Sequence, residues 1–155
     1  LYDNITFTLI SPPELKMPAE IVSELTAAGH DVIETEDMET GLNDNDTVYL
    51  TRIQEERFTT KLEADIYRGR FRLNQSIYTR YCQPNTVIMH PLPRDSREEA
   101  NELDSDLNQH PNLAIFRQTD NGVVVRMALF ALVLDVADKI DDSATDVGWY
   151  TQGRF

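Results

Sequence analysis

Residues 47–51 read Thr-Val-Tyr-Leu-Thr, a short run of β-branched and apolar residues that is typical of a buried strand at the centre of a sheet. Before it, residues 5–10 and 31–34 favour strands, while residues 18–28 and 38–42 favour short helices. The order is therefore β-α-β-α-β. Strands that alternate with helices predict an α/β domain with a mostly parallel sheet and helices on both faces, a Rossmann-like fold of three layers.

The segments after this core have weaker patterns. Residues 75–81 favour a helix, and residues 86–89 are a short apolar strand that stops at a pair of prolines. Residues 96–109 are charged and carry only a weak apolar stripe, so we expect an exposed helix or a mobile loop there. Residues 112–116 are a candidate last strand.

The C-terminal part divides into a helix and a tail. Residues 121–140 predict a long helix whose first half is apolar nearly all round, so we expect it to pack between layers. Arg126 is an isolated cation in this helix, and it either clamps a carboxylate or points into a site; we favour the structural role. The domain organisation predicted is an α/β domain at residues 1–120, the helix, and an unassigned tail at residues 141–155.

Composition excludes several classes of function. The 27 acidic residues outnumber the 14 basic ones, and this net charge of -13 argues against nucleic-acid binding. The single cysteine, Cys82, cannot form an internal disulfide, and no Cys/His cluster has the spacing of a metal site, so a cytoplasmic protein without a metal is expected. Residues 123–136 are too short and too charged to span a membrane. Dinucleotide, P-loop and serine-hydrolase motifs are also missing from the sequence, so no cofactor is predicted.

Polar side chains follow the central strand at the place where α/β domains bind ligands, beyond the carboxyl ends of the strands. Arg52 and Gln54 are two residues apart, so they lie on the same side if the strand continues. A planar guanidinium and a carboxamide together suit the carboxylates of a small dicarboxylic acid. The alternative is a surface arginine paired with Glu55 or Glu56, which composition alone favours.

A second motif follows the strand at residues 86–89. Residues 90–94 read His-Pro-Leu-Pro-Arg, in which two prolines fix the backbone and remove two N–H donors. The result is a stiff corner whose carbonyl oxygens are suited to accept hydrogen bonds from a substrate NH2 group. The alternative is an ordinary structural turn. The other two histidines, His30 and His110, are interpreted as packing residues.

The two motifs resemble the C-terminal signatures of the aspartate carbamoyltransferases, in the form Tyr49-Leu50-Thr51-Arg52-Ile53-Gln54-x-Glu56-Arg57 and His90-Pro91-Leu92-Pro93-Arg94. Two further stretches resemble the family in the same order, Ser11-Pro12-x-x-Leu15-x-Met17-Pro18 and Asn121-Gly122-Val-Val-Val-Arg126. The sister enzymes that act on ornithine carry His-Cys-Leu-Pro and lack the Thr-Arg-x-Gln pair. Aspartate is therefore the acceptor that the resemblance implies.

The resemblance implies a transferase of one-carbon groups that moves a carbamoyl group from carbamoyl phosphate to L-aspartate, in pyrimidine biosynthesis. Arg52 and Gln54 are then expected to hold the aspartate carboxylates. The carbonyls of Pro91 and Leu92 are expected to receive the carbamoyl NH2 group, next to a cis peptide before Pro93. Supporting roles are implied for four more residues: His90, Arg94, Arg57 and Arg126.

The resemblance covers about half of a family chain. The N-terminal carbamoyl-phosphate domain is outside this sequence, and the helix at 121–140 packs back on it in the family, so these 155 residues alone are expected to be inactive. Family enzymes are homotrimers. Glu55 stands where many members have a basic residue, and the stretch after Arg94 departs from the family pattern. The alternative that remains open is a non-catalytic α/β remnant, kept as an assembly or binding module.

Overall fold

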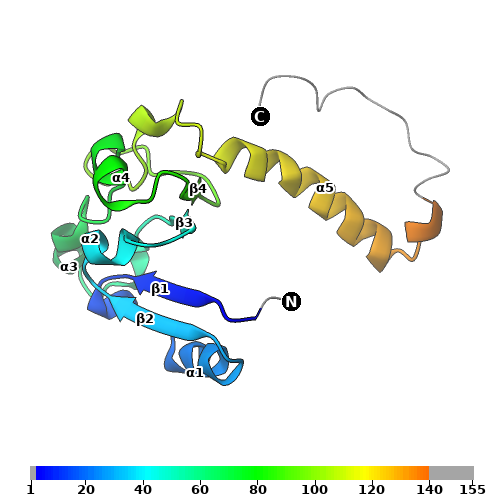
Figure 1. Ribbon diagram of the computed structural model, residues 1–155, viewed down its shortest axis with the longest axis horizontal. Helices are drawn as coiled ribbons and strands as arrows, with labels where there is room; N and C mark the ends of the chain where they lie inside the picture. Colours follow the sequence, from blue (N-terminus) through cyan, green and yellow to red (C-terminus); the bar gives the residue numbers. More distant parts are fainter. Residues whose placement is uncertain (1–2, 140–155) are drawn as a thin grey trace.

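The strands of the protein pair in parallel. The computed structural model describes residues 3–139; in it β1 (Thr6–Ile10) pairs with β2 (Asp31–Thr35), and β3 (Thr47–Tyr49) pairs with β4 (Val87–Met89). Figure 1 shows the two pairs next to each other in the order β2, β1, β3, β4. The predicted α/β class with parallel strands is confirmed.

Short helices connect the first three strands. α1 (Ala19–Ala27) is followed by Ala28 as C-cap and then by Gly29, whose φ of 87° is in the left-handed region that favours glycine. α2 (Met38–Leu42) is capped by the Asp37 carboxylate and packs against β1 and β2. The packing is close at Gly41, because a Cβ added there would lie 2.6 Å from Cγ1 of Ile10.

Two helices separate β3 from β4. α4 (Gln75–Tyr81) has the bounds that the sequence predicted, and the Asn74 side chain caps it by accepting from the N–H of Ile77. α3 (Lys61–Tyr67) was not predicted, although its signal is present: Thr60 and Glu63 form a capping box that satisfies the first N–H groups of the helix.

The segment at residues 96–109 corrects the prediction of an exposed helix or a mobile loop. It is irregular apart from the 3-10 turn η3 (Ser105–Leu107), yet Leu103 and Leu107 are fully buried in the core. Leu73 anchors the segment, since its N–H donates to Glu102 O at 2.8 Å and its carbonyl accepts from Asp104 N at 2.9 Å. Long-range bonds of this kind leave no periodic signal in the sequence.

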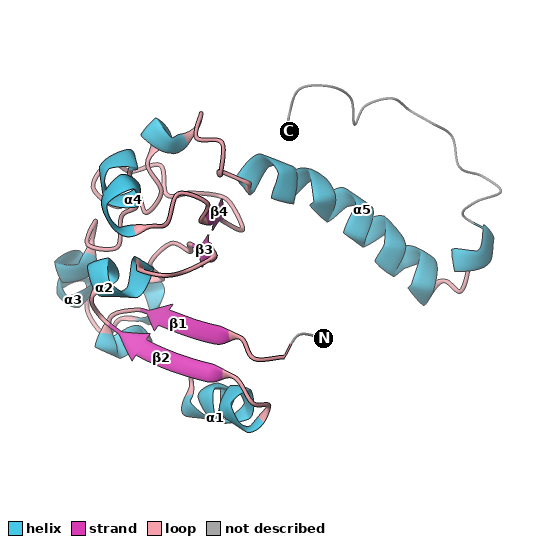
Figure 2. Ribbon diagram, in the orientation of Figure 1, coloured by secondary structure: helices cyan, strands magenta, loops and turns pink. Residues whose placement is uncertain are grey.

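The last helix also differs from the prediction. α5 (Ile115–Val133) begins before Asn121, and the candidate strand at 112–116 is reduced to one bridge between Leu113 and Ile88. Ile140 and the tail that follows lie outside the described residues. Figure 2 shows α5 running away from the strands. The expectation that it packs between layers is wrong for this chain, because most of its apolar side chains are exposed: Phe116, Val123, Val124, Val125, Met127, Leu129, Phe130, Leu132 and Val133.

His30 and His110 both pack against aromatic rings, as the sequence predicted. His30 accepts a hydrogen bond from Ile5 N through Nδ1 and packs edge-on against Phe7, and His110 packs against Tyr78. No helix within residues 3–139 is long and apolar enough to cross a membrane.

The burial of the 96–109 segment can be tested with Leu103→Ala. Leu103 is 0% exposed, so the substitution leaves a cavity and should lower the free energy of unfolding by about 2–5 kcal/mol. Leu62→Ala is the matched control: Leu62 lies on α3 and is 78% exposed, and it should cost less than about 0.5 kcal/mol. Urea unfolding followed by circular dichroism measures both, and equal losses would contradict the buried position of Leu103.

Candidate functional site

The two polar motifs leave the sheet at the same edge. β3 and β4 are adjacent and parallel, with Tyr49 opposite Met89, and one residue further Leu50 N donates to Met89 O at 2.9 Å. The chain that follows β3 therefore starts beside the chain that follows β4. This places Arg52 and the prolyl corner, defined as residues 90–94, on neighbouring strand ends as the sequence predicted.

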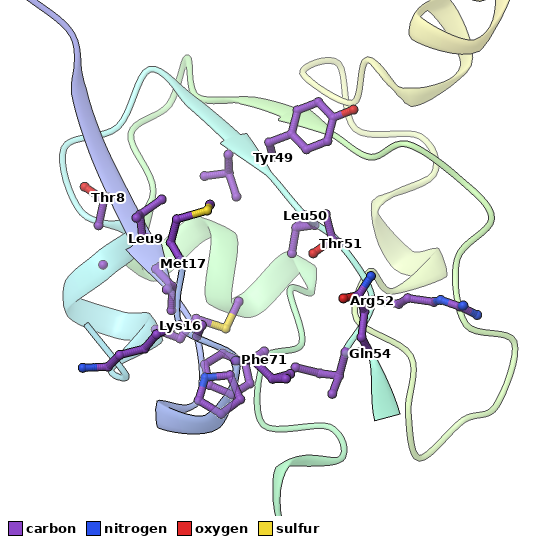
Figure 3. A pocket seen from close by; sticks show the side chains of 18 of the residues that line it. Thr8, Leu9, Lys16, Met17, Tyr49, Leu50, Thr51, Arg52, Gln54 and Phe71 are labelled. Atoms are coloured by element: carbon purple, nitrogen blue, oxygen red, sulfur yellow. The ribbon is translucent and has the colours of Figure 1, made fainter. Parts of the chain in front are cut away.

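A pocket of about 470 Å³ opens on the β1 side of this edge. Figure 3 shows Arg52 and Gln54 on the β3 side of the pocket and Lys16 and Met17 on the opposite side, with the guanidinium of Arg52 extending away from Lys16 and Met17. Arg57 and Phe71 contribute to the same lining. The turn after β1, which resembled the family only as a sequence pattern, thus becomes a wall of the pocket. The proline-rich residues 91–93 are not part of this lining and border the β3 end from the β4 side.

The guanidinium of Arg52 is open to a ligand. Its side chain is 55% exposed, and its only ion pair within residues 3–139 is a 4.0 Å contact with the exposed Glu56. Such a long, exposed pair contributes little energy. The alternative, a surface arginine paired with a glutamate, is present in the structure as this one long contact, which is too weak to keep Arg52 from binding another carboxylate. The side chain of Gln54 is also exposed.

The prolyl corner is held from inside by His90. Its Nδ1 accepts from Leu92 N at 2.8 Å, so the proton is on Nε2, which donates to Glu102 Oε1 at 2.7 Å. The peptide between Leu92 and Pro93 is cis, as the resemblance implied. Because the side chain of His90 is 1% exposed, it supports the corner and does not contact a ligand.

Glu102 is a site residue that the sequence analysis missed. Both of its carboxylate oxygens also accept from Asp95 N at 3.2 Å, so one buried side chain fixes both sides of the prolyl corner. Burial by itself raises the pKa of this carboxyl, but the hydrogen bonds from His90 and the backbone outweigh it, and the pKa is lowered. The only signal was an acidic residue in a stretch expected to be exposed.

Gln118 was missed for a similar reason. It lies in the first turn of α5, where Oε1 accepts from His90 N at 3.1 Å and Nε2 donates to Tyr49 Oη at 2.8 Å. A single carboxamide therefore ties α5 to the ends of both β3 and β4. No feature of the sequence marked Gln118, because the helix was expected to begin after it.

Two further residues with predicted supporting roles, Arg94 and Arg126, lie in different parts of the structure. Arg94 is partly buried and donates to Asn108 Oδ1 at 2.9 Å, so it braces the corner against the end of η3. Arg126 lies in the exposed part of α5 and does not line the pocket. Its guanidinium folds back over Gly122, one turn earlier in the same helix, where a Cβ would lie 3.3 Å from Nη1. Among residues 3–139, no group of three or more His, Cys, Asp or Glu residues is arranged to hold a metal ion.

The fold and this edge define a class of protein: a parallel α/β domain with an exposed guanidinium, a carboxamide and a prolyl corner at the carboxyl ends of two neighbouring strands, where domains of this class bind ligands. The family model described as "Aspartate/ornithine carbamoyltransferase, Asp/Orn binding domain" matches residues 2–133. The chain belongs to this family, as its Asp/Orn-binding domain.

Individual relatives agree with the family. The chain is 66% identical over 154 residues to the aspartate carbamoyltransferase catalytic subunit of Cellvibrio japonicus, covering 99% of the chain and 46% of that protein. It is 63% identical over 155 residues to the corresponding subunit of Saccharophagus degradans, covering 100% and 46%. The chain thus spans about half the length of the curated relatives that it matches.

Solved structures show the same fold. The catalytic subunit of M. jannaschii aspartate transcarbamoylase superposes with a TM-score of 0.72 at 30% identity, covering 94% of this chain and 43% of that one. The Trypanosoma cruzi enzyme, in complex with carbamoyl aspartate and phosphate, gives a TM-score of 0.67 at 26% identity, covering 81% and 39%. Both likenesses agree with the resemblance seen in the sequence.

The role of Glu102 in the corner can be tested by Glu102→Ala. The substitution leaves the buried Nε2–H of His90 and the N–H of Asp95 without an acceptor, and it should lower the free energy of unfolding by about 2–4 kcal/mol at pH 7. Glu24→Ala, on the exposed face of α1, is the control with the same change of charge.

The pH dependence of this loss has a definite sign. The folded pKa of Glu102 lies below the ordinary value of 4.5, so its contribution is fully present above that value and disappears as the pH falls through the folded pKa. The difference between wild type and Glu102→Ala should therefore shrink in acid, measured as urea midpoints from pH 7 down to pH 3. A difference that grows in acid would show that Glu102 is not the ionised acceptor.

Proposed function

We propose that the protein carrying this chain is an aspartate carbamoyltransferase and that the chain supplies its aspartate-binding half. The observation that carries the proposal is the shared strand edge, where an open Arg52 lies beside a prolyl corner fixed by a buried His–Glu pair. The reaction transfers the carbamoyl group of carbamoyl phosphate to L-aspartate and gives N-carbamoyl-L-aspartate and phosphate. The 66% and 63% identities to catalytic subunits of this name support it.

The residues of this chain act by position and charge. The fork of Arg52 binds one aspartate carboxylate with two N–H groups, and the carboxamide of Gln54 donates to the other. The carbonyls of Pro91 and Leu92 accept from the carbamoyl NH2 group and fix its orientation. The aspartate amine then attacks the carbamoyl carbon; a C–N bond forms, the C–O bond to phosphate breaks, and the amine loses a proton. A fixed geometry of this kind lowers the entropic part of the barrier.

The charge at the site favours aspartate over ornithine as the acceptor. The family description covers both amino acids, which differ in the charge of their side chains. An exposed guanidinium whose ion pair with Glu56 is long, at 4.0 Å, attracts the second carboxylate of aspartate and repels the ammonium group of ornithine. The relatives named above are aspartate enzymes, in agreement with this charge.

We further propose that α5 packs against the carbamoyl-phosphate domain in the complete protein. Its exposed apolar residues include three consecutive valines at 123–125 and two adjacent pairs at 129–130 and 132–133, so at 100° per residue they are spread around the whole helix. This is a larger apolar surface than a soluble domain normally leaves in water. The relatives contain more than twice the length of this chain, which provides a domain to cover it. A homotrimer and a cytoplasmic location are proposed with the activity, on the family resemblance and the single cysteine.

A bisubstrate analogue tests whether the whole protein combines the two substrates. N-(phosphonacetyl)-L-aspartate, found in a complex with the Trypanosoma cruzi relative, should bind the full-length protein at least about 100-fold more tightly than aspartate alone. Isothermal titration calorimetry measures both affinities. A binding module that lacks catalytic function predicts no such gain, and equal affinities would contradict the proposed activity.

The role of Arg52 is tested by Arg52→Ala in the full-length protein. Loss of a charge-assisted contact should lower kcat/KM for aspartate by the equivalent of about 1.5–3 kcal/mol. Arg80→Ala removes the same charge from the exposed face of α4, where Arg80 stacks on Tyr81, and should leave the kinetics unchanged. Aspartate saturation curves measure both variants. If Arg52→Ala behaves like Arg80→Ala, the site is not at this strand edge.

A further inference from the structure

One guanidinium connects the two strand-end loops. Arg97 donates to both carboxylate oxygens of Glu55, from Nη1 to Oε2 at 3.2 Å and from Nη2 to Oε1 at 2.8 Å. It also donates to both oxygens of Asp95, from Nε at 3.0 Å and from Nη2 at 2.6 Å. Glu55 directly follows Gln54, and Asp95 directly follows the prolyl corner. Arg97 is therefore a bidentate bridge between the segments that carry the proposed substrate contacts.

The bridge continues into α3. Arg68, the residue that follows α3, lies 3.5 Å from Glu55 and 2.6 Å from Asp65 through Nη2. Glu55 is thus held between two arginines, and the charges alternate in sign along the series Asp65, Arg68, Glu55, Arg97, Asp95. Three of these side chains are largely shielded, with exposures of 13% for Asp95, 19% for Arg68 and 28% for Glu55. Arg97 itself is 44% exposed, but bidentate pairs joined in a network hold their geometry better than isolated surface pairs.

Arg97 pairs two negative charges on the loops that flank Arg52: Asp95, whose carboxylate is attracted by Arg52, and Glu55, three residues after Arg52 in the chain. A hydrogen bond from Arg97 is the main reason that the pKa of Asp95 falls to about 2, and the positive charge of Arg52 adds a smaller attraction. The pKa of Glu55 is also lowered, chiefly by Arg97. Both carboxylates are therefore ionised at neutral pH. Without Arg97 they would compete with a substrate carboxylate for Arg52 and would repel a dianionic ligand.

We propose that Arg97 is a positioning residue for carbamoyl transfer: it holds the Arg52–Gln54 loop against the prolyl corner and keeps Glu55 and Asp95 paired, so that Arg52 is free for aspartate. This inference rests on the proposed function. Arg97 acts through the two loops and does not touch the substrate. Its effect should therefore fall on the affinity for aspartate more than on the chemical step, and it should depend on the shape of the guanidinium.

The test compares Arg97→Met, Arg97→Lys and the control Arg80→Met in the full-length protein. Arg97→Met should raise the aspartate KM roughly three- to tenfold, with kcat changed less than about twofold and the KM for carbamoyl phosphate unchanged. Arg97→Lys should be intermediate, because one ammonium group cannot make both bidentate contacts. Glu55→Gln in the Arg97→Met background should recover part of the loss, since it removes one of the unpaired carboxylates.

The outcomes separate the two proposals. An inactive wild-type protein would overturn the proposed function and this inference together. An active wild type in which Arg97→Met behaves like Arg80→Met would overturn the inference alone. A loss of kcat and of both substrate affinities, with a lowered Tm and no partial rescue by Arg97→Lys, would show that Arg97 only stabilises the fold. Arg97→Lys retains the positive charge, so it keeps the test decisive if Arg97→Met does not fold.

Discussion

The parallel pairing of β3 with β4 is the constraint on which the candidate site depends. Two parallel neighbours must end at the same edge of the sheet, so the segments that follow them start side by side although their first residues, Leu50 and His90, are far apart in the sequence. An antiparallel pair would have placed them at opposite edges. The edge that results combines an exposed cation, Arg52, with a prolyl corner held by buried hydrogen bonds, and in the proposed function these two groups bind different parts of the ligand.

Rigidity at this edge comes from a buried polar network. His90, Glu102 and Gln118 bond to the backbone of residues 90, 92 and 95 and to the Tyr49 hydroxyl. Burying a carboxylate costs free energy, and the cost is offset here because Glu102 accepts from a ring N–H and from a backbone N–H. Such a network is stable only when all its members are present, which makes the corner a single unit.

The apolar side chains of α5 are mostly not covered by the rest of this domain. The first turn of the helix is fixed to the sheet, since Ala114 N donates to Ile88 O at 2.9 Å and Ile115 is fully buried, but the apolar turns that follow lie in solvent. The helix therefore has a defined direction without a covered surface. An apolar surface held in a fixed direction is suited to packing against another domain.

The sequence by itself determined the α/β class, the bounds of α4 and the two strand-end motifs, because strand alternation, helix periodicity and proline geometry are local properties. The expectation that Arg52 and Gln54 share a face of a continued strand is not met, because β3 ends at Tyr49 and residues 50–54 are irregular; only the tertiary structure brings both residues into one pocket lining. Only the tertiary structure decided the burial of Leu103, the roles of Glu102 and Gln118 and the bridge made by Arg97. These depend on contacts between segments that are distant in sequence, and such contacts impose no periodicity on the residues that make them.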